Sequence, residues 1–542
     1  MMTTKLQSVF FAALASAALA CAPSTTGTTT VPTPVPGSPE PTPATPVITK
    51  APLPAPNPGL PPVPTVTGPL EIKVVYPDSG QLIQSKDSNF IFGSVGNGDA
   101  ALSINGISAP VWPNGSFMAW LPNPPADAPR YDIVATTGLD TARLSLAVKI
   151  KPLPTIPPPP PDTIQPLVPA RFASLIGPPA YASDTDRVIT GYSLAGGIQR
   201  WFLMPNTVVK VTGTKGSDDY VQLDSTKTIR IDKGDVSLLD SAFVPVARNA
   251  SAFKLTDKGE WTDVVIPICD KPSYYVEEGP SGMTLTLYGT NGPAKKQLGV
   301  EAPPASYIKT VTAMSDGPQM KYAFDLKGPI YGYLVMWQEG SLTFRVRRPP
   351  KVDPASPLLG RTIAIDPGHP PVGATGPTGL WEPEATLAVG FKVQELLQAK
   401  GVKVIMTRST PDPVDLYVRP AMARRENAEA FVSIHLNAVP DGQNPFRAQG
   451  TATYHYYLHS APLADSVDRT AVAHLALPDK GVKRENFAVI RGTWMPSILV
   501  EGAFIIMPDQ EAALRTPEYQ LQYAQGIVDG LENYFRGLAQ QR

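Results

Sequence analysis

All five histidines of this 542-residue chain lie between His369 and His474. Two of them stand in strings that are typical of metal sites, "IAIDPGH" ending at His369 and "FVSIHLNA" around His435. An acidic "WEPE" lies between these strings, and Glu501 follows them on the apolar run "SILVEGAF". Two imidazoles and a carboxylate bind Zn²⁺ in catalytic sites, where three protein ligands leave one position for water. We therefore expect the chemistry of the chain to lie in residues 358–542.

The apolar runs beside these residues predict how they are positioned. His369 follows the strand-like "IAID", while His435 and Glu501 are expected at the ends of the strands "FVSI" and "SILV". Ligands of open α/β sheets bind outside the carboxyl ends of the strands. A charged glutamate on a buried strand is costly unless its charge is used or paired. The three residues are therefore expected to converge at one edge of a sheet.

The region around them alternates between strand and helix patterns. "VKVIMT", "TATYHYYL" and "FAVI" also resemble strands, and "EATLAVGFKVQELLQAKG" carries apolar residues at helical spacing before Gly401. Residues 351–542 are therefore predicted to form an α/β domain with a mostly parallel sheet flanked by helices.

The motifs of this region resemble those of a known family. "IAIDPGH", "WEPEATL", "VIMTRST", "LYVR", "FVSIHLNA", "GTATYHYY" and "MPSILVEGAFI" stand in the order found in zinc-dependent N-acetylmuramoyl-L-alanine amidases. The resemblance implies that His369, Glu382 and His435 are the Zn²⁺ ligands and that Glu501 is the catalytic carboxylate. It further implies hydrolysis of the amide bond between N-acetylmuramic acid and L-alanine in peptidoglycan, for wall remodelling or separation of daughter cells.

Several alternatives remain open at this point. Glu384 competes with Glu382 as the third ligand, and Arg419, which matches a family arginine, has either a structural or a functional role. His455 and His459 are expected at a strand edge, with contact between His455 and substrate as an alternative, and His474 is expected to be structural. A different class of function is a catalytically silent envelope protein that binds peptidoglycan for attachment.

Two features depart from the family pattern. Pro370 and Pro371 follow His369 where glycine is common, and they stiffen that loop. The segment between His435 and Gly450 is too short for the helix that plugs the site in some relatives. The site is therefore expected to be open unless an upstream domain covers it. An envelope regulator is a further candidate partner.

The N-terminus has the features of an export signal. Residues 1–20 hold a short apolar stretch with small residues, which predicts a signal peptide. Cys21 follows it in "AALAC", which resembles the lipidation site of bacterial lipoproteins; ordinary cleavage with an incidental Cys21 is the alternative. Residues 21–69 are rich in proline and threonine and are expected to be a disordered linker, either a spacer or merely passive. We therefore expect an exported protein of the cell envelope, periplasm or wall, held at a membrane only through this anchor.

Two β-rich regions are expected between the linker and the C-terminal domain. Short alternating runs between Asn-Gly turns predict an immunoglobulin-like β-sandwich over residues 70–150, followed by a proline-rich linker over 151–168. Residues 169–350 are expected to form two small β domains, with Cys269 as an apolar core residue. Only two cysteines occur in the chain, so a disulfide framework is excluded. A net charge of −1 gives no general affinity for nucleic acid.

Overall fold

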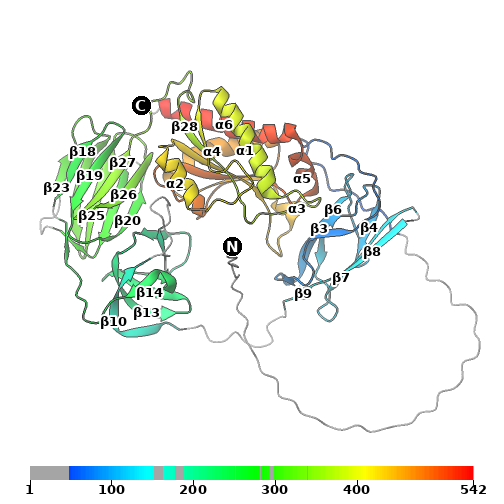
Figure 1. Ribbon diagram of the computed structural model, residues 1–542, viewed down its shortest axis with the longest axis horizontal. Coiled ribbons are helices and arrows are strands. Elements are labelled where there is room, and N and C mark those ends of the chain that lie inside the picture. Colours follow the sequence, from blue (N-terminus) through cyan, green and yellow to red (C-terminus); the bar gives the residue numbers. More distant parts are fainter. Residues whose placement is uncertain are drawn as a thin grey trace, which may run out of the picture. The chain divides into compact units, whose positions relative to one another are not determined.

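The computed structural model describes residues 48–138, 140–151, 163–176, 188–250, 252–280, 282–292, 298–338 and 340–540 (Figure 1). The expected signal peptide, Cys21 and the first half of the expected linker lie outside the described residues. Within the described ranges, no helix combines the length and the apolar character that a membrane-spanning segment needs.

Residues 73–150 form two antiparallel sheets around one core. The sheets have the strand orders β1-β3-β6 and β5-β4-β7-β8, and a short parallel pair, β2 with β9, joins the ends of the region. Ile91, Phe117 and Ile133 come from both sheets and share one hydrophobic cluster. The strands are β1 (Lys73–Tyr76), β2 (Leu82–Ile83), β3 (Ser88–Ser94), β4 (Ala101–Ile104), β5 (Ile107–Ala109), β6 (Ser116–Pro122), β7 (Arg130–Thr137), β8 (Asp140–Ala147) and β9 (Lys149–Ile150).

The described part of the expected linker, residues 48–69, has little regular secondary structure but makes defined contacts. The Lys50 ammonium donates to the Gly98 carbonyl at 2.7 Å, and the Asn57 amide donates to Asp509 at 3.0 Å. Leu60 and Val63 pack against the core of the C-terminal domain. This stretch therefore lies against folded surfaces and is not a free tether.

Two further β units follow. The first has a seven-stranded sheet, of order β12-β11-β15-β14-β13-β10-β16, built around the buried Trp201. Its strands are β10 (Gln165–Leu175), β11 (Ile189–Tyr192), β12 (Arg200–Leu203), β13 (Val208–Lys215), β14 (Asp218–Asp224), β15 (Lys227–Asp232) and β16 (Val236–Leu238). β10 begins inside the expected second linker.

The second unit packs a four-stranded sheet, β18-β19-β27-β26, against a five-stranded sheet, β20-β21-β25-β24-β23, and both sheets contribute to one cluster. A short parallel pair consists of β17 (Arg248–Asn249) and β22 (Thr290–Asn291). β17 comes before the strands of these two sheets in the chain, and β22 lies between β21 and β23. Its other strands are β18 (Lys254–Asp257), β19 (Trp261–Pro267), β20 (Ser273–Glu278), β21 (Gly282–Tyr288), β23 (Leu298–Glu301), β24 (Ile308–Asp316), β25 (Gln319–Leu326), β26 (Gly332–Gln338) and β27 (Ser341–Arg347).

The C-terminal domain contains a six-stranded sheet of order β29-β28-β30-β33-β31-β32. All neighbouring strands are parallel except β31 and β33, which confirms the predicted α/β class and the mostly parallel sheet. The strands are β28 (Thr362–Pro367), β29 (Lys403–Met406), β30 (Ala430–Asn437), β31 (Thr451–His455), β32 (Asp479–Arg484) and β33 (Ser497–Phe504).

Helices cover one face of this sheet. Apolar residues of α1 (Glu382–Ala399), α4 (Ala461–Leu475) and α6 (Pro517–Gln540) form one cluster with Ile363, Val432 and Val500, and α1 and α6 are visible above the strands in Figure 1. The neighbouring residues Ala364, Phe431 and Leu499 point to the other face, since successive side chains alternate along a strand. There they meet α2 (Val418–Arg425) and the 3-10 turn η3 (Ala488–Ile490).

Some sequence-based expectations were wrong. "FAVI" is not a strand, because its last three residues form η3. Glu501 does not end its strand, since β33 continues to Phe504. Cys269 is an exposed free thiol and not a core residue, because it follows the end of β19 in a turn. The strand β32 and the helices α3 (Pro445–Ala448) and α5 (Pro508–Leu514) had no matching expectation.

Candidate metal centre

Three of the predicted site residues meet beside the sheet. His369 Nε2 lies 3.1 Å from one carboxylate oxygen of Glu382, and His435 Nδ1 lies 3.2 Å from the other. One ligand atom from each of the three residues falls within 4.8 Å of the others. Two imidazole nitrogens and a carboxylate at this separation are a donor set that fits a transition metal ion such as Zn²⁺.

The turn after β28 places His369. Its backbone has a φ of 58°, a left-handed conformation that is uncommon for a residue other than glycine and is often found at functional sites. The preceding Gly368 lies so close to the His435 ring that a Cβ atom there would stand 2.6 Å from Nε2. Glycine at this position therefore lets the two imidazoles approach, with ring centroids 4.8 Å apart.

Glu382 is the first residue of α1, and its side chain is buried. Its carboxylate accepts backbone hydrogen bonds from Ala374 and Leu436, both at 3.0 Å. Burial opposes ionisation, but the hydrogen bonds with His369 and His435 outweigh it and hold the pKa of Glu382 well below its usual range. Glu382 is therefore an anion fixed in place, whereas the rival Glu384 lies on the exposed side of α1.

Glu501 lies beside these three residues. It pairs in register with His435 across β30 and β33, and its Oε2 atom is buried without a hydrogen-bond partner among the described residues. Burial raises the pKa of Glu501 to about 7, and the nearby Glu382 acts in the same direction, against the opposing effect of His435. A buried carboxylate with an unused oxygen next to a metal ligand set is placed to accept a proton.

Two buried arginines hold the His369 turn. Arg419 donates from its guanidinium to Asp366 at 3.1 Å and to the His369 carbonyl at 3.0 Å, so its contacts are structural. Arg408 donates to the carbonyls of Gly368 at 2.8 Å and Pro383 at 2.7 Å, and so joins the turn to α1. Burial lowers the pKa of Arg408 to about 10, with Arg419 acting in the same direction. Arg408 lies in the motif "VIMTRST", and this motif was the feature of the sequence from which its role could have been predicted.

Two more buried groups support the site from the C-terminal segment. Glu511 of α5 accepts backbone hydrogen bonds from Thr378 and Leu380, and thereby shapes the loop that leads into Glu382. The Tyr523 hydroxyl of α6 donates to the Val500 carbonyl at 2.9 Å and lies 3.2 Å from the His435 carbonyl. No spacing in the sequence connects these residues to the histidine motifs.

The other histidines have different surroundings. His455 Nδ1 lies 2.9 Å from the Tyr457 carbonyl at the far end of β31, and His474 pairs with Asp529 on the neighbouring helix at 2.8 Å. His459 is buried and pairs with Glu278 of β20 at 2.7 Å, which joins the C-terminal domain to the preceding β unit. None of the three lies with the His369, Glu382 and His435 cluster.

An α/β domain that gathers two histidines, a glutamate and a buried carboxylate at the edge of a mostly parallel sheet has the design of a metal-dependent hydrolase. Residues 363–533 match the family model described as N-acetylmuramoyl-L-alanine amidase. The chain is 35% identical over 192 residues to the uncharacterized protein YqiI of Bacillus subtilis, and the match covers 34% of this chain and 90% of YqiI. The chain therefore belongs to the N-acetylmuramoyl-L-alanine amidase family.

Other relatives match a similar share of the chain. The chain is 36% identical over 187 residues to the N-acetylmuramoyl-L-alanine amidase LytC of Bacillus subtilis, covering 33% of this chain but only 37% of LytC. Among solved structures, the amidase AmiC2 of Nostoc punctiforme is 35% identical, with 32% of this chain and 96% of that chain covered and a TM-score of 0.30. The β-rich units, which end at Arg347, lie outside the family match over residues 363–533.

Proposed function

We propose that the chain hydrolyses the amide bond between N-acetylmuramic acid and L-alanine in peptidoglycan, with Zn²⁺ held by His369, Glu382 and His435. The observation that carries the proposal lies inside the segment that matches the family. The three ligand atoms lie within 4.8 Å of one another, and the nearby Glu501 Oε2 has no hydrogen-bond partner among the residues that the structure describes.

Each side chain of the site has a separate role in amide hydrolysis. When bound at this site, Zn²⁺ supplies a lowered pKa for water and polarisation of the substrate carbonyl. Glu501 accepts the proton of the attacking water at its free oxygen and returns it to the leaving amine of L-alanine. The backbone N–H groups of Ala374 and Leu436 hold the Glu382 carboxylate in place. Arg408 and Arg419 fix the turn that carries His369.

Digestion of purified peptidoglycan by the full-length exported chain tests this function. Mass spectrometry should find stem peptides with a free L-alanine amino group and glycan strands with intact sugars. The double variant His369→Ala, His435→Ala should bind no Zn²⁺ and release no peptide. An undigested wall together with retained binding to it would instead support the silent attachment protein, and cleavage within the glycan or the stem would refute the proposed bond.

The location and the accessory units complete the proposal. A relative from Staphylococcus aureus that is 33% identical is named a probable cell wall amidase, which supports an envelope location. We place the chain outside the cytoplasm, anchored through Cys21 or secreted plainly, and without a dedicated nucleic-acid partner. The two antiparallel sheets of residues 73–150, with one shared core, support an immunoglobulin-like spacer.

A further inference from the structure

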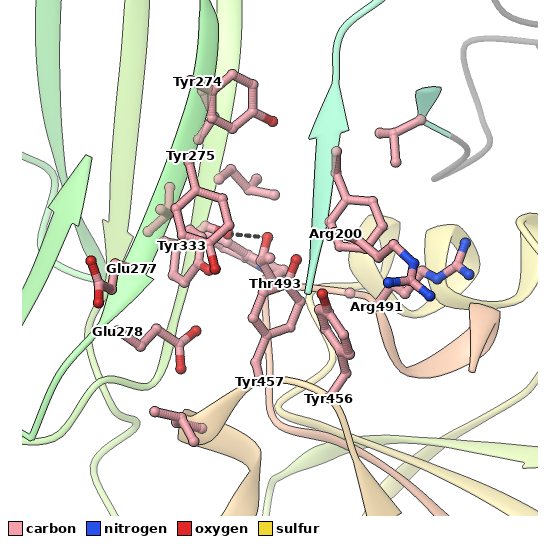
Figure 2. Close-up of a pocket in the computed structure, with 18 of the residues that line it drawn as sticks. Arg200, Tyr274, Tyr275, Glu277, Glu278, Tyr333, Tyr456, Tyr457, Arg491 and Thr493 are labelled. Carbon is pink, nitrogen blue, oxygen red and sulfur yellow. Dashed lines mark hydrogen bonds between the residues drawn. The ribbon is translucent and has the colours of Figure 1, made fainter. Parts of the chain in front are cut away.

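A second hollow lies away from the candidate metal centre. It has a volume of about 590 Å³ and is lined by residues of both preceding β units and of the C-terminal domain (Figure 2). β31 runs antiparallel to β33, so that Ala452 pairs with Glu501 but His455 pairs with Ile498 near the start of β33. Tyr456 and Tyr457, which line the hollow, therefore lie at the opposite end of the sheet from Glu501.

Three sheet edges converge on this hollow. β12, β20 and β26 each stand at an edge of their own sheet, and residues of all three line the cavity. The edge of β26 is tied to the C-terminal domain, because Tyr333 N–H donates to the Thr493 carbonyl at 2.8 Å and the Thr493 hydroxyl donates back at 2.6 Å. An edge strand leaves backbone donors and acceptors available for an extended peptide.

The charges of the hollow are separated. Glu277 and Glu278 of β20 lie on one side, and Arg200 and Arg491 lie on the other, with tyrosines between them (Figure 2). Glu278 is engaged by His459, whereas exposed Glu277 has no ion pair within the described ranges. Arg200 donates to the carbonyls of Gly197 and Gln199, and Arg491 donates to the Asn486 side chain. Each guanidinium also lies over an aromatic ring, Arg200 over Tyr192 at 4.7 Å and Arg491 over Phe202 at 5.5 Å. Neither group therefore has a carboxylate partner within the described ranges, and Arg200 Nε has no hydrogen-bond acceptor there.

The wall between the two charged sides is aromatic. Tyr456 and Tyr457 pack edge to face with ring centroids 4.9 Å apart, and Phe202 meets Tyr456 in the same way at 5.7 Å. The ring of Tyr333 meets that of Tyr457 at 6.1 Å. Such a wall contacts the apolar stem of a ligand while its ends are held by charge.

We propose that this hollow binds the stem peptide of peptidoglycan as a second, non-catalytic site. The free carboxylate of the peptide would pair with Arg200 and Arg491, and the ammonium of its diamino acid would pair with Glu277. The backbone of the peptide would lie along the edges of β12 and β20, since the edge of β26 already pairs with Thr493. This assignment rests on the proposed function for its choice of ligand, and it would hold the enzyme on a peptide next to the one being cut.

The test titrates the full-length zinc-loaded chain with a free tetrapeptide of the stem, which has no muramic acid amide to be cleaved. Calorimetry should show binding that weakens at least tenfold in the double variant Arg200→Glu, Arg491→Glu. Acetylation of the side-chain amine of the peptide should weaken binding to the wild type, and Glu277→Gln should remove this difference. A matched control, Arg143→Glu with Lys149→Glu, makes the same charge change on exposed residues of the first sandwich and should leave binding unchanged.

Turnover of a small soluble muropeptide is measured on the same proteins. The Arg200→Glu, Arg491→Glu variant should cleave it at the wild-type rate, which also shows that the variant is folded. Equal peptide affinity in wild type and this variant would overturn the second site, as would loss of binding in the Arg143→Glu, Lys149→Glu control. If neither the wild type nor any variant cleaves the muropeptide, the proposed function is overturned. The calorimetric comparison of peptide affinities still decides whether the second site exists.

Discussion

The surroundings of Glu501 suit a proton acceptor. Its Oε2 atom is buried and has no hydrogen-bond partner in the part of the chain that the structure describes, next to three residues whose ligand atoms lie within 4.8 Å of one another. We predict that Glu501→Gln keeps Zn²⁺ but loses turnover by about 10²- to 10⁴-fold, because the water lacks its proton acceptor. Metal content by atomic emission and kinetics on a soluble muropeptide check this. Near wild-type turnover would remove Glu501 from the mechanism, and loss of metal would make it a ligand.

The choice between two glutamates of α1 gives a second prediction. Glu382 is buried between the two histidines, whereas Glu384 is exposed two residues later. Glu382→Gln should therefore weaken Zn²⁺ binding strongly, and the matched variant Glu384→Gln should bind Zn²⁺ like the wild type. Competition with a chromogenic chelator measures both affinities, and the reverse order would move the ligand assignment to Glu384.

At this scale, the sequence predicted the residues that lie at strand ends or in the quoted motifs. The proximity of His369, His435 and Glu501 was expected because ligands of open α/β sheets bind at the carboxyl ends of the strands. This expectation did not require Glu501 to be the last residue of its strand, and β33 in fact extends past it. Glu511 and Tyr523 were not predictable in this way. Each acts through hydrogen bonds to backbone groups far away in sequence, for which no local pattern exists.

At the scale of elements, Arg419 of α2 forms a buried ion pair with Asp366 of β28 and also donates to the His369 carbonyl. Arg419 and Asp366 are both almost fully buried, and Asp366 also accepts from Ser433 at 2.7 Å. We predict that Arg419→Met lowers the free energy of unfolding of the domain by about 3–5 kcal/mol, because it leaves a buried carboxylate without its charge partner. Chemical denaturation followed by Trp fluorescence measures this. The double variant Arg419→Met, Asp366→Asn should recover part of the loss, and full stability of the single variant would contradict the prediction.

Asp468 of α4 predicts that the stability of the domain depends on pH. Burial raises the pKa of Asp468 to about 6, above its ordinary value of 3.8. The folded state therefore holds a proton that the unfolded state releases, so this group makes stability fall as pH rises from about 4 to 6. Thermal midpoints across that range should show a smaller fall in Asp468→Asn than in the wild type. The exposed variant Asp465→Asn is the control, and identical pH profiles for wild type and Asp468→Asn would contradict the prediction.

Elements with strong patterns were predictable and weak ones were not. α1 was expected from its apolar spacing, whereas β32 has the polar sequence "DKGVKR" and forms only by pairing with β31 at the sheet edge. "FAVI" has an apolar sequence typical of a strand, but its last three residues turn in η3 to cover the sheet face. Tertiary contacts decide both cases.

At the scale of the whole molecule, the N-terminus gives the last prediction. If Cys21 is lipidated, wild type should sediment with membranes and Cys21→Ser should become a soluble exported form, since several acyl chains anchor firmly. Cell fractionation and the mass of the mature N-terminal peptide measure this. A wild type that is already soluble would favour plain secretion and leave the catalytic assignment unaffected.

The first sandwich buries apolar residues on both sides of its three-stranded sheet. Ile91 faces the core of its own unit, while its neighbours Phe90 and Phe92 belong to the same cluster as the core of the C-terminal domain. On the other sheet face of that domain, Phe202, Trp261 and Leu334 of the later β units pack against its second cluster. Residues 363–533, which match the family model, thus pack against neighbouring units on two sides in this chain. A fragment cut at these two residues would therefore expose apolar side chains of the C-terminal domain that the neighbouring units cover in the whole chain.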